Sequence, residues 1–103
     1  MTPKQPKLSD AEIHQAVGSL PGWKLDGGML EKTYSLPTFP EAIVFVNAVA
    51  HLAELANHHP DVDIRYSKIT LRLVTHDSGG ITTKDVSLAK EVEAARAKMG
   101  LPV

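Results

Sequence analysis

Five histidines occur in this chain of 103 residues, and three of them lie in one stretch between Glu54 and Asp85. His58 and His59 are adjacent and precede a proline, and His76 follows a run of alternating apolar residues. Free imidazole titrates near neutrality, so a group of histidines can both donate and accept a proton at working pH. The stretch therefore predicts acid–base catalysis, at positions where regular elements end and loops begin.

The carboxylates at the two ends of this stretch are candidates to hold an imidazole in place. Glu54 and Asp85 could fix a tautomer or stabilise an imidazolium, as carboxylates do beside catalytic histidines. Glu54 and His58 would lie one turn apart if the helix that contains Glu54 extends that far. Because His58 and His59 are adjacent, they must point in different directions, so one could meet a substrate while the other braces it. His76 can approach them only through folding.

Each of these residues also has an ordinary structural explanation. His58 and His59 could form the polar end of a helix, where a protonated histidine favours the helix dipole. Asp85 could act only as the third residue of a capping box, and Glu54 only as a solvated helix residue. A further alternative is that the two adjacent histidines and His76 bind zinc, since three histidines and a water form a catalytic zinc arrangement. Adjacent histidines, however, lack the i, i+4 spacing of helical zinc motifs.

The composition argues against several classes of protein. The 11 Lys and Arg residues nearly balance 12 Asp and Glu residues, and no polybasic segment offers a surface for nucleic acid or anionic lipid. The chain contains no cysteine, so it has no disulfide, no thiolate nucleophile and no cysteine-ligated metal. We find no signal-like apolar segment near the start and expect no run long enough to span a bilayer. We therefore expect a cytoplasmic protein without nucleic-acid or membrane partners.

The spacing of apolar residues and of turn and capping residues predicts three helices and two hairpins. We expect helices at about 9–17, 40–57 and 82–99, and strands at 23–25, 29–36, 62–66 and 69–75. The order α-β-β-α-β-β-α predicts a single α+β domain, residues 9–103, with a four-stranded antiparallel sheet and helices packed on one face. Residues 1–8 lack periodicity and are expected to form a flexible arm.

Aromatic residues are scarce, with one Trp, two Tyr and two Phe in the whole chain. The core must therefore be built mainly from aliphatic side chains, and a core this thin favours a homo-oligomer. The strand expected at 69–75 is the candidate for a sheet edge that is unpaired in one chain.

Three segments resemble the pterin-4a-carbinolamine dehydratase (4a-hydroxytetrahydrobiopterin dehydratase) family: AELANHHPDV at 53–62, YSKI at 66–69 and THDSGGITTKDVSLA at 75–89. The resemblance extends over nearly the whole chain from Ser9 onward. It implies a single α+β domain that dehydrates 4a-hydroxytetrahydropterins to quinonoid dihydropterins, a step in tetrahydrobiopterin recycling, without metal or organic cofactor. It also implies assembly as a homodimer or homotetramer.

The resemblance assigns roles to individual residues. It makes His58 and His76 the acid–base residues at the 4a-hydroxyl, His59 an assisting residue, and Asp85 the supporting carboxylate. The residues that it implies for pterin binding are Glu54, His59, Pro60 and Thr75. The chain departs from the family pattern at Ser67, where asparagine is common, and at Leu36, where an aromatic residue is usual.

The family resemblance also suggests an alternative function. Vertebrate members act as dimerisation cofactors of a homeodomain transcription factor, so a protein-interaction module is the main alternative to an enzyme.

Overall fold

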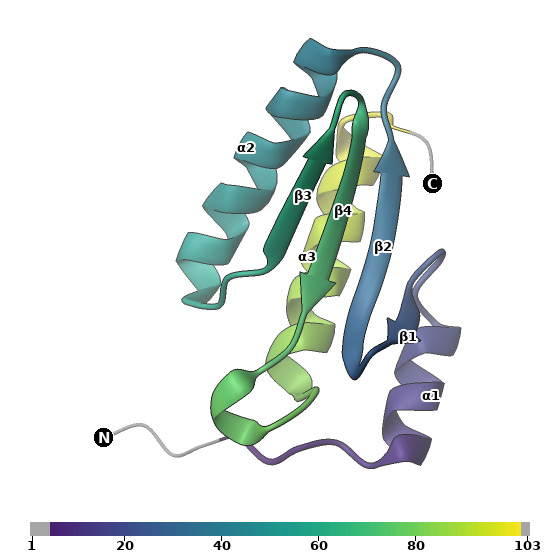
Figure 1. Cartoon of the computed structure of the whole chain (residues 1–103), viewed down its shortest axis with the longest axis vertical. Helices are drawn as coiled ribbons and strands as arrows, with labels where there is room; N and C mark the ends of the chain where they lie inside the picture. Colours follow the sequence, from purple (N-terminus) through teal and green to yellow (C-terminus); the bar gives the residue numbers. More distant parts are fainter. Residues whose placement is uncertain (1–4, 102–103) are drawn as a thin grey trace.

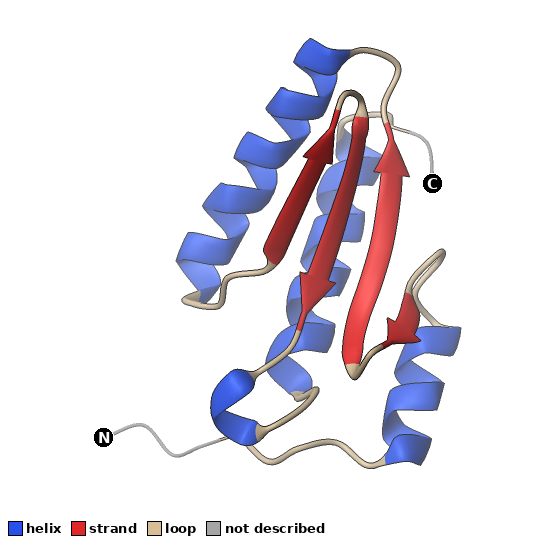
Figure 2. Cartoon of the chain, viewed as in Figure 1, coloured by secondary structure: helices blue, strands red, loops and turns tan. Residues whose placement is uncertain are grey.

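The computed structural model of the chain describes residues 5–101. Its elements, in order, are α1 (Asp10–Gly18), β1 (Lys24–Asp26), β2 (Met29–Ser35), α2 (Phe39–Ala56), β3 (Asp61–Arg65), β4 (Lys68–Leu73), the short 3-10 turn η1 (His76–Ser78) and α3 (Thr83–Lys98). The strands form one antiparallel sheet in the order β1-β2-β4-β3. The long helices α2 and α3 cover one face of this sheet and leave the other face open (Figures 1 and 2). The predicted α+β class and the predicted element order are confirmed.

The helices begin where the capping residues predict. At α1 the Ser9 hydroxyl accepts from the Glu12 amide at 3.2 Å, and the Glu12 carboxylate accepts from the Ser9 amide at 2.8 Å. At α2 the Thr38 hydroxyl accepts from the amide of Glu41, and Pro40 lies in the first turn, where its missing N–H costs nothing. These contacts satisfy amides that the helix itself leaves unpaired.

The alternation of side chains along β4 decides which face of the sheet is buried. Ile69, Leu71 and Leu73 point to the helices and are buried, whereas Thr70 and Arg72 between them are only half-buried. The helices complete the core with apolar side chains at three- and four-residue spacing: Ala42, Phe45, Val49 and Ala53 from α2, and Leu88, Ala89 and Val92 from α3. The predicted division of the two faces is therefore confirmed.

The prediction that the strand at 69–75 lies at an unpaired edge of the sheet is wrong. β4 lies between β2 and β3 and pairs with both of them, so the segment 69–75 does not form an unpaired edge. The edges of the sheet are β1 and β3. On β3 the apolar side chains of Val62 and Ile64 are 41% and 44% exposed, although they share a face with buried partners on β4. Any association through a sheet edge would therefore use β3 or β1.

The expected N-terminal arm covers residues 1–8, of which 1–4 lie outside the described residues. Gln5 to Leu8 have no regular secondary structure, but they contact the segment that leads into α3. The Ser78 hydroxyl donates to the Gln5 carbonyl at 2.5 Å, and the Leu8 amide donates to the Ile81 carbonyl at 2.8 Å. Of the expected arm, the described residues Gln5 and Leu8 thus already contact the domain.

α2 has the length that the sequence predicts, but its composition is more apolar than that expectation allowed for. By length and composition alone this helix could cross a membrane, contrary to the expectation that no run is long enough. Its spaced apolar residues, Phe45 and Val49 among them, are buried against α3 and the sheet. The core helix of a globular domain passes the same length and composition test.

A buried polar cluster around Glu93 of α3 joins this helix to β2. The Glu93 carboxylate accepts from Lys32 at 2.7 Å and from the Trp23 indole at 3.2 Å, and the Tyr34 hydroxyl donates to the same oxygen. Burial by itself raises the pKa of Glu93, but the hydrogen bonds from Lys32 and Tyr34 and the charge of Lys32 outweigh it and leave that pKa lowered. Burial and the bond to Glu93 raise the pKa of Tyr34.

Candidate active site

The end of α2 sends two histidines in different directions. Asn57 caps the helix in the left-handed conformation with φ of 50°, which asparagine tolerates better than most residues. The amide of His58 then donates to the Ala53 carbonyl at 3.1 Å, which is the bond of a Schellman motif that spans five residues. Because the helix ends there, His58 turns toward α3 while His59 stays at the surface.

His58 is held by the carboxylate of Asp85. Its Nε2 lies 2.5 Å from Asp85 Oδ1, the imidazole side chain is 11% exposed, and the carboxylate is fully buried. A carboxylate only accepts hydrogen bonds, so in this pair Nε2 carries the proton. Within residues 5–101 no protein group bonds the other ring nitrogen, Nδ1, which can therefore face a substrate.

Asp85 serves as both a helix cap and a partner of His58, because its two oxygens bind different groups. Oδ2 accepts from the Thr82 amide at 2.9 Å, which closes the capping box of α3, and from the Thr75 hydroxyl at 2.9 Å. Oδ1 is left for His58. The cap therefore does not exclude a functional role for the same side chain.

Thr75 connects the end of the sheet to this carboxylate. Its backbone pairs with Gly80 across the loop that contains η1, and its buried hydroxyl lies 2.8 Å from the hydroxyl of Thr82. The loop therefore brings Thr75 back onto the first turn of α3. The Thr75 hydroxyl thereby helps to hold the Asp85 carboxylate in the position from which it bonds His58.

Glu54 pairs with His59, and the helix does not extend far enough to place Glu54 and His58 one turn apart on the same side. The distance from His59 Nε2 to Glu54 Oε1 is 2.7 Å, and the two side chains are 61% and 78% exposed. An exposed pair of this kind contributes little to stability because water and salt screen it. The condition for that spacing is not met, because α2 ends at Ala56, two residues before His58.

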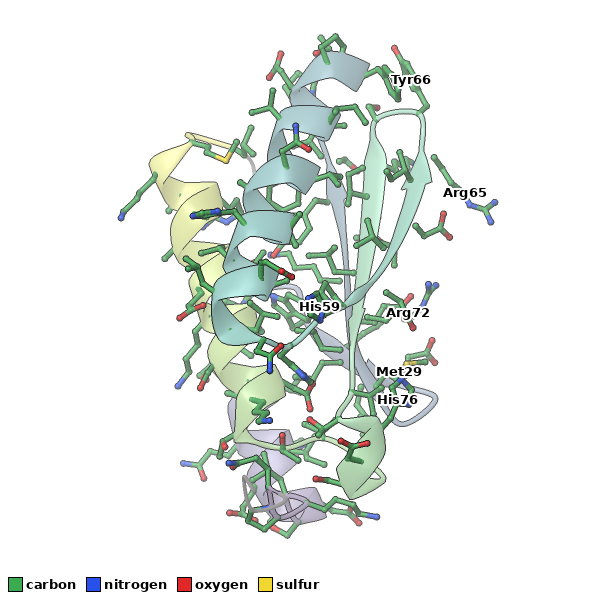
Figure 3. The ribbon with its side chains drawn as sticks, turned by 90° about the vertical axis from the view of Figure 1, so that its left-hand side faces the viewer. Met29, His59, Arg65, Tyr66, Arg72 and His76 are labelled. Atoms are coloured by element: carbon green, nitrogen blue, oxygen red, sulfur yellow. The ribbon has the colours of Figure 1, made fainter. Side chains whose placement is uncertain are left out.

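His76 begins η1 and is exposed. In the side view of Figure 3, His59 lies toward α2, whereas His76 lies beside Met29 at the open face of the sheet. The two imidazoles therefore approach the end of β4 from different sides.

A cleft of about 330 Å³ lies where these segments meet. It is lined by Asn57, His58, His59, Val74, Thr75, His76, Asp77 and Lys84. The structure thus brings the three predicted histidines and Thr75 around one cleft. Asp85 lies behind it, and Glu54 and Pro60 do not line it.

Several residues that line the cleft were not predicted from the sequence, and Lys84 is the most informative of these. It lies between the capping residues Thr82 and Asp85, so its sequence position indicated only a helix start. Its exposed side chain also lines a neighbouring pocket of about 210 Å³ next to His58. The only feature of the sequence that could have indicated its place at the cleft is its position directly before Asp85.

Metal ligation is an alternative role for the histidines at the cleft. Within residues 5–101 no three His, Asp or Glu side chains converge as a set that could hold a metal ion. Each of the paired imidazoles is bonded to its own carboxylate, His58 to Asp85 and His59 to Glu54. Such a group, with one oriented histidine and two more at the same cleft, is suited to moving protons to and from a bound molecule.

Comparison with known proteins assigns the family. The model of the family described as pterin 4 alpha carbinolamine dehydratase matches residues 6–95. The chain belongs to this family. A protein of Roseiflexus sp. (strain RS-1) named "Putative pterin-4-alpha-carbinolamine dehydratase" is 55% identical over 87 residues, 84% of this chain and 94% of its own length. A protein with the same name from Chloroflexus aurantiacus is 49% identical over 88 residues, 85% of this chain and 95% of its own length.

Solved structures share the fold. The crystal structure of a transcriptional coactivator/pterin dehydratase from Brucella melitensis aligns with a TM-score of 0.82 at 29% identity, over 85% of this chain and 96% of that one. A pterin dehydratase-like protein identified as a RuBisCO assembly factor in the alpha-carboxysome aligns with a TM-score of 0.61 at 22% identity, over 71% and 87% of the two chains. The second likeness concerns the fold alone.

Proposed function

We propose that this pterin carbinolamine dehydratase family member converts 4a-hydroxytetrahydropterins to quinonoid dihydropterins and water by histidine acid–base catalysis. The observation that carries the proposal is the buried Asp85 carboxylate bonded to His58 at the cleft that His59 and His76 also line. Family membership supports the substrate class. As a hydro-lyase of this kind, the protein would contribute to tetrahydrobiopterin recycling.

The reaction needs two proton transfers and no change of oxidation state. The lone pair on N5 forms a double bond to C4a as the C4a–O bond breaks. The departing hydroxyl takes up a proton and leaves as water, and N5 gives up its own proton. An acid must therefore lie at the hydroxyl and a base at N5, and general acid–base groups typically contribute on the order of 10²- to 10⁴-fold each.

His58 is our candidate for the base, because Asp85 engages Nε2 and leaves Nδ1 free to accept. The Asp85 carboxylate then acts as in other carboxylate–imidazole pairs, by setting the tautomer and orientation of the ring. His76, at the opposite rim of the cleft, is the candidate for the acid at the 4a-hydroxyl. These two assignments complete the proton balance.

The remaining predicted residues take binding roles in this proposal. His59 contacts the pterin from the α2 side, and Glu54 orients His59 from outside the cleft. Thr75 lines the cleft and holds Asp85. Pro60 lies between His59 and the start of β3. It does not line the cleft, but its ring restricts the backbone conformation beside His59.

We also propose that the chain works as a homodimer or homotetramer in the cytoplasm. The edge strand β3 supports association, because Val62 and Ile64 expose apolar surface beside a free edge. Pairing of two such edges would cover these side chains.

The decisive experiment is direct. A 4a-hydroxytetrahydropterin is generated in solution, and its dehydration is followed by absorbance with and without the purified chain. We expect the chain to accelerate the decay well beyond the uncatalysed rate. Equal decay with and without the protein would remove the proposal.

A further inference from the structure

Residues 5–8, which we call the strap, pass beside the loop that carries His76. This loop, residues 75–80, contains η1, and we call it the η1 loop. In Figure 1 the chain runs close beneath η1 before it turns into α1. The strap has no regular secondary structure, so its contacts with the η1 loop and with the residues that follow this loop must hold it in place.

Backbone groups at both ends of the strap bond this region. The Gln5 carbonyl accepts from the hydroxyl of Ser78, the last residue of η1, at 2.5 Å. The Leu8 amide donates at 2.8 Å to the carbonyl of Ile81, the residue just after the η1 loop. Leu8 also packs against the hydrophobic core, which anchors this end of the strap to the domain. The strap is therefore fixed at both of its ends.

Side chains of the strap add two further contacts. The stem of Lys7 lies so close to Gly80 that a Cβ built on this glycine would come within 2.7 Å of Lys7 Cδ. The Thr83 hydroxyl donates to Gln5 Oε1 at 3.2 Å. Pro6 lies between these contacts, and its ring limits the conformations that the strap loses when it docks. A segment without helix or strand periodicity can therefore be ordered at a modest cost in entropy.

The inner side of the η1 loop is held by Thr75. Its amide donates to the Gly80 carbonyl at 3.0 Å, and its hydroxyl donates to the Asp85 carboxylate at 2.9 Å. His76 lies between Thr75 and Ser78, and in the described part of the chain its exposed imidazole has no protein hydrogen-bond partner. The backbone of the η1 loop therefore sets the direction of this ring, and Thr75 and the strap together hold that backbone.

We propose that the strap positions His76 for the reaction, with Gln5 and Ser78 as positioning residues that act through the backbone of the η1 loop. This inference rests on the proposed function, in which His76 is the acid. A displacement of about 1 Å in a reacting group can cost on the order of 10²-fold in rate. The strap therefore belongs to the scaffold of the candidate active site, although none of its residues lines the cleft that the three histidines share.

The first test removes one bond between the strap and the loop. Ser78→Ala deletes the donor to Gln5, and Ser78→Thr keeps a hydroxyl at the same position. We expect kcat for dehydration to fall about tenfold in Ser78→Ala and to stay parental in Ser78→Thr. KM should change little in either variant, because Ser78 does not line the cleft.

The second test removes the strap itself. Deletion of residues 1–7 takes away the contacts of Gln5 and Lys7, whereas deletion of residues 1–4 leaves every contact named above in place. We expect kcat to fall by on the order of 10-fold or more in the longer deletion and to stay parental in the shorter one. Dehydration assays at 25 °C and thermal unfolding of both proteins separate lost activity from lost stability.

Hydrogen exchange followed by mass spectrometry gives a measurement that does not depend on turnover. The amides of Ser78 and Gly79 close η1 through bonds to Thr75 and His76, both at 3.0 Å. We expect these amides to exchange about tenfold faster in the longer deletion than in the shorter one, while the amides of α2 keep their parental rates.

The outcomes distinguish positioning from simple stabilisation. Parental kcat in Ser78→Ala and in the longer deletion would overturn the inference, and so would a lower Tm with parental kcat and exchange. An equal fall in both deletions would place the effect in residues 1–4 and also overturn it. If the longer deletion does not fold, Ser78→Ala decides. If the full chain does not dehydrate the substrate, the proposed function fails, and the exchange rates still decide whether the strap holds the η1 loop.

Discussion

Replacing Asp85 with asparagine separates the two tasks of this buried side chain. The carbonyl oxygen of asparagine can take the place of Oδ2 and accept from the Thr82 amide and the Thr75 hydroxyl, which both bond that oxygen at 2.9 Å. The side-chain NH₂ group then takes the place of Oδ1, 2.5 Å from His58 Nε2 in the parent. The helix cap is therefore retained, while an acceptor facing the imidazole becomes a donor.

This change alters which nitrogen of His58 carries the proton. In the parent, Nε2 donates to the carboxylate and Nδ1 has a free lone pair. In Asp85→Asn, Nε2 must accept, so the proton of the neutral ring moves to Nδ1. The proposed base is thereby turned into a donor, and the negative charge beside it is lost. We expect turnover to fall on the order of 10²- to 10⁴-fold.

The expected loss of stability is too small to explain such a fall. The capping bonds survive, and weakening one charge-assisted bond costs about 1–2 kcal/mol. For a domain of this size each kcal/mol corresponds to a decrease in Tm of roughly 4–8 °C. Thermal unfolding followed by circular dichroism measures this loss, and dehydration assays at 25 °C measure the loss of activity.

The first capping box provides a matched control. Glu12→Gln makes the same carboxylate-to-amide change at the third position of α1, where the side chain accepts from the Ser9 amide and contacts no imidazole. We expect parental turnover in Glu12→Gln. If Asp85→Asn is as active as this control, Asp85 is only a cap and our account of His58 is wrong.

Four other predictions follow from the structure. His58→Ala and His76→Ala should each lower turnover by on the order of 10²-fold or more while circular dichroism stays parental, and full activity in both would remove the acid–base assignment. Activity should persist in a chelator; loss that added zinc restores would favour a metal enzyme. Sedimentation should show an oligomer at micromolar concentration that Ile64→Lys weakens, and a parental monomer would contradict this. Glu93→Gln should lower the free energy of unfolding at pH 7 by about 3 kcal/mol. Because the pKa of Glu93 is lowered in the fold, this contribution is present above the unfolded value near 4.5 and is lost as pH falls further, so urea titrations should converge at acid pH.

The sequence by itself determined the local features of this protein. Helix starts follow from capping pairs three residues apart, such as Ser9 with Glu12, and the first hairpin follows from Gly27 and Gly28, which accept positive φ. Strand alternation placed Ile69 on the buried face. These features depend on neighbours within a few residues, so a pattern in one segment is enough to predict them. The histidine-rich segments also indicated the family, which the family model confirms.

Only the tertiary structure decided how the candidate site is assembled. His58 and Asp85 are 27 positions apart, and their pairing depends on where α2 ends and on how the loop after β4 returns to α3. Because α2 ends where it does, Glu54 bonds His59 and not His58. The order of the strands places β4 inside the sheet and β3 at its edge. Lys84 lines the cleft because the loop after β4 returns the chain to the start of α3 beside the histidines. Contacts of this kind depend on the closure of loops and on sheet order, and no local pattern of side chains encodes them.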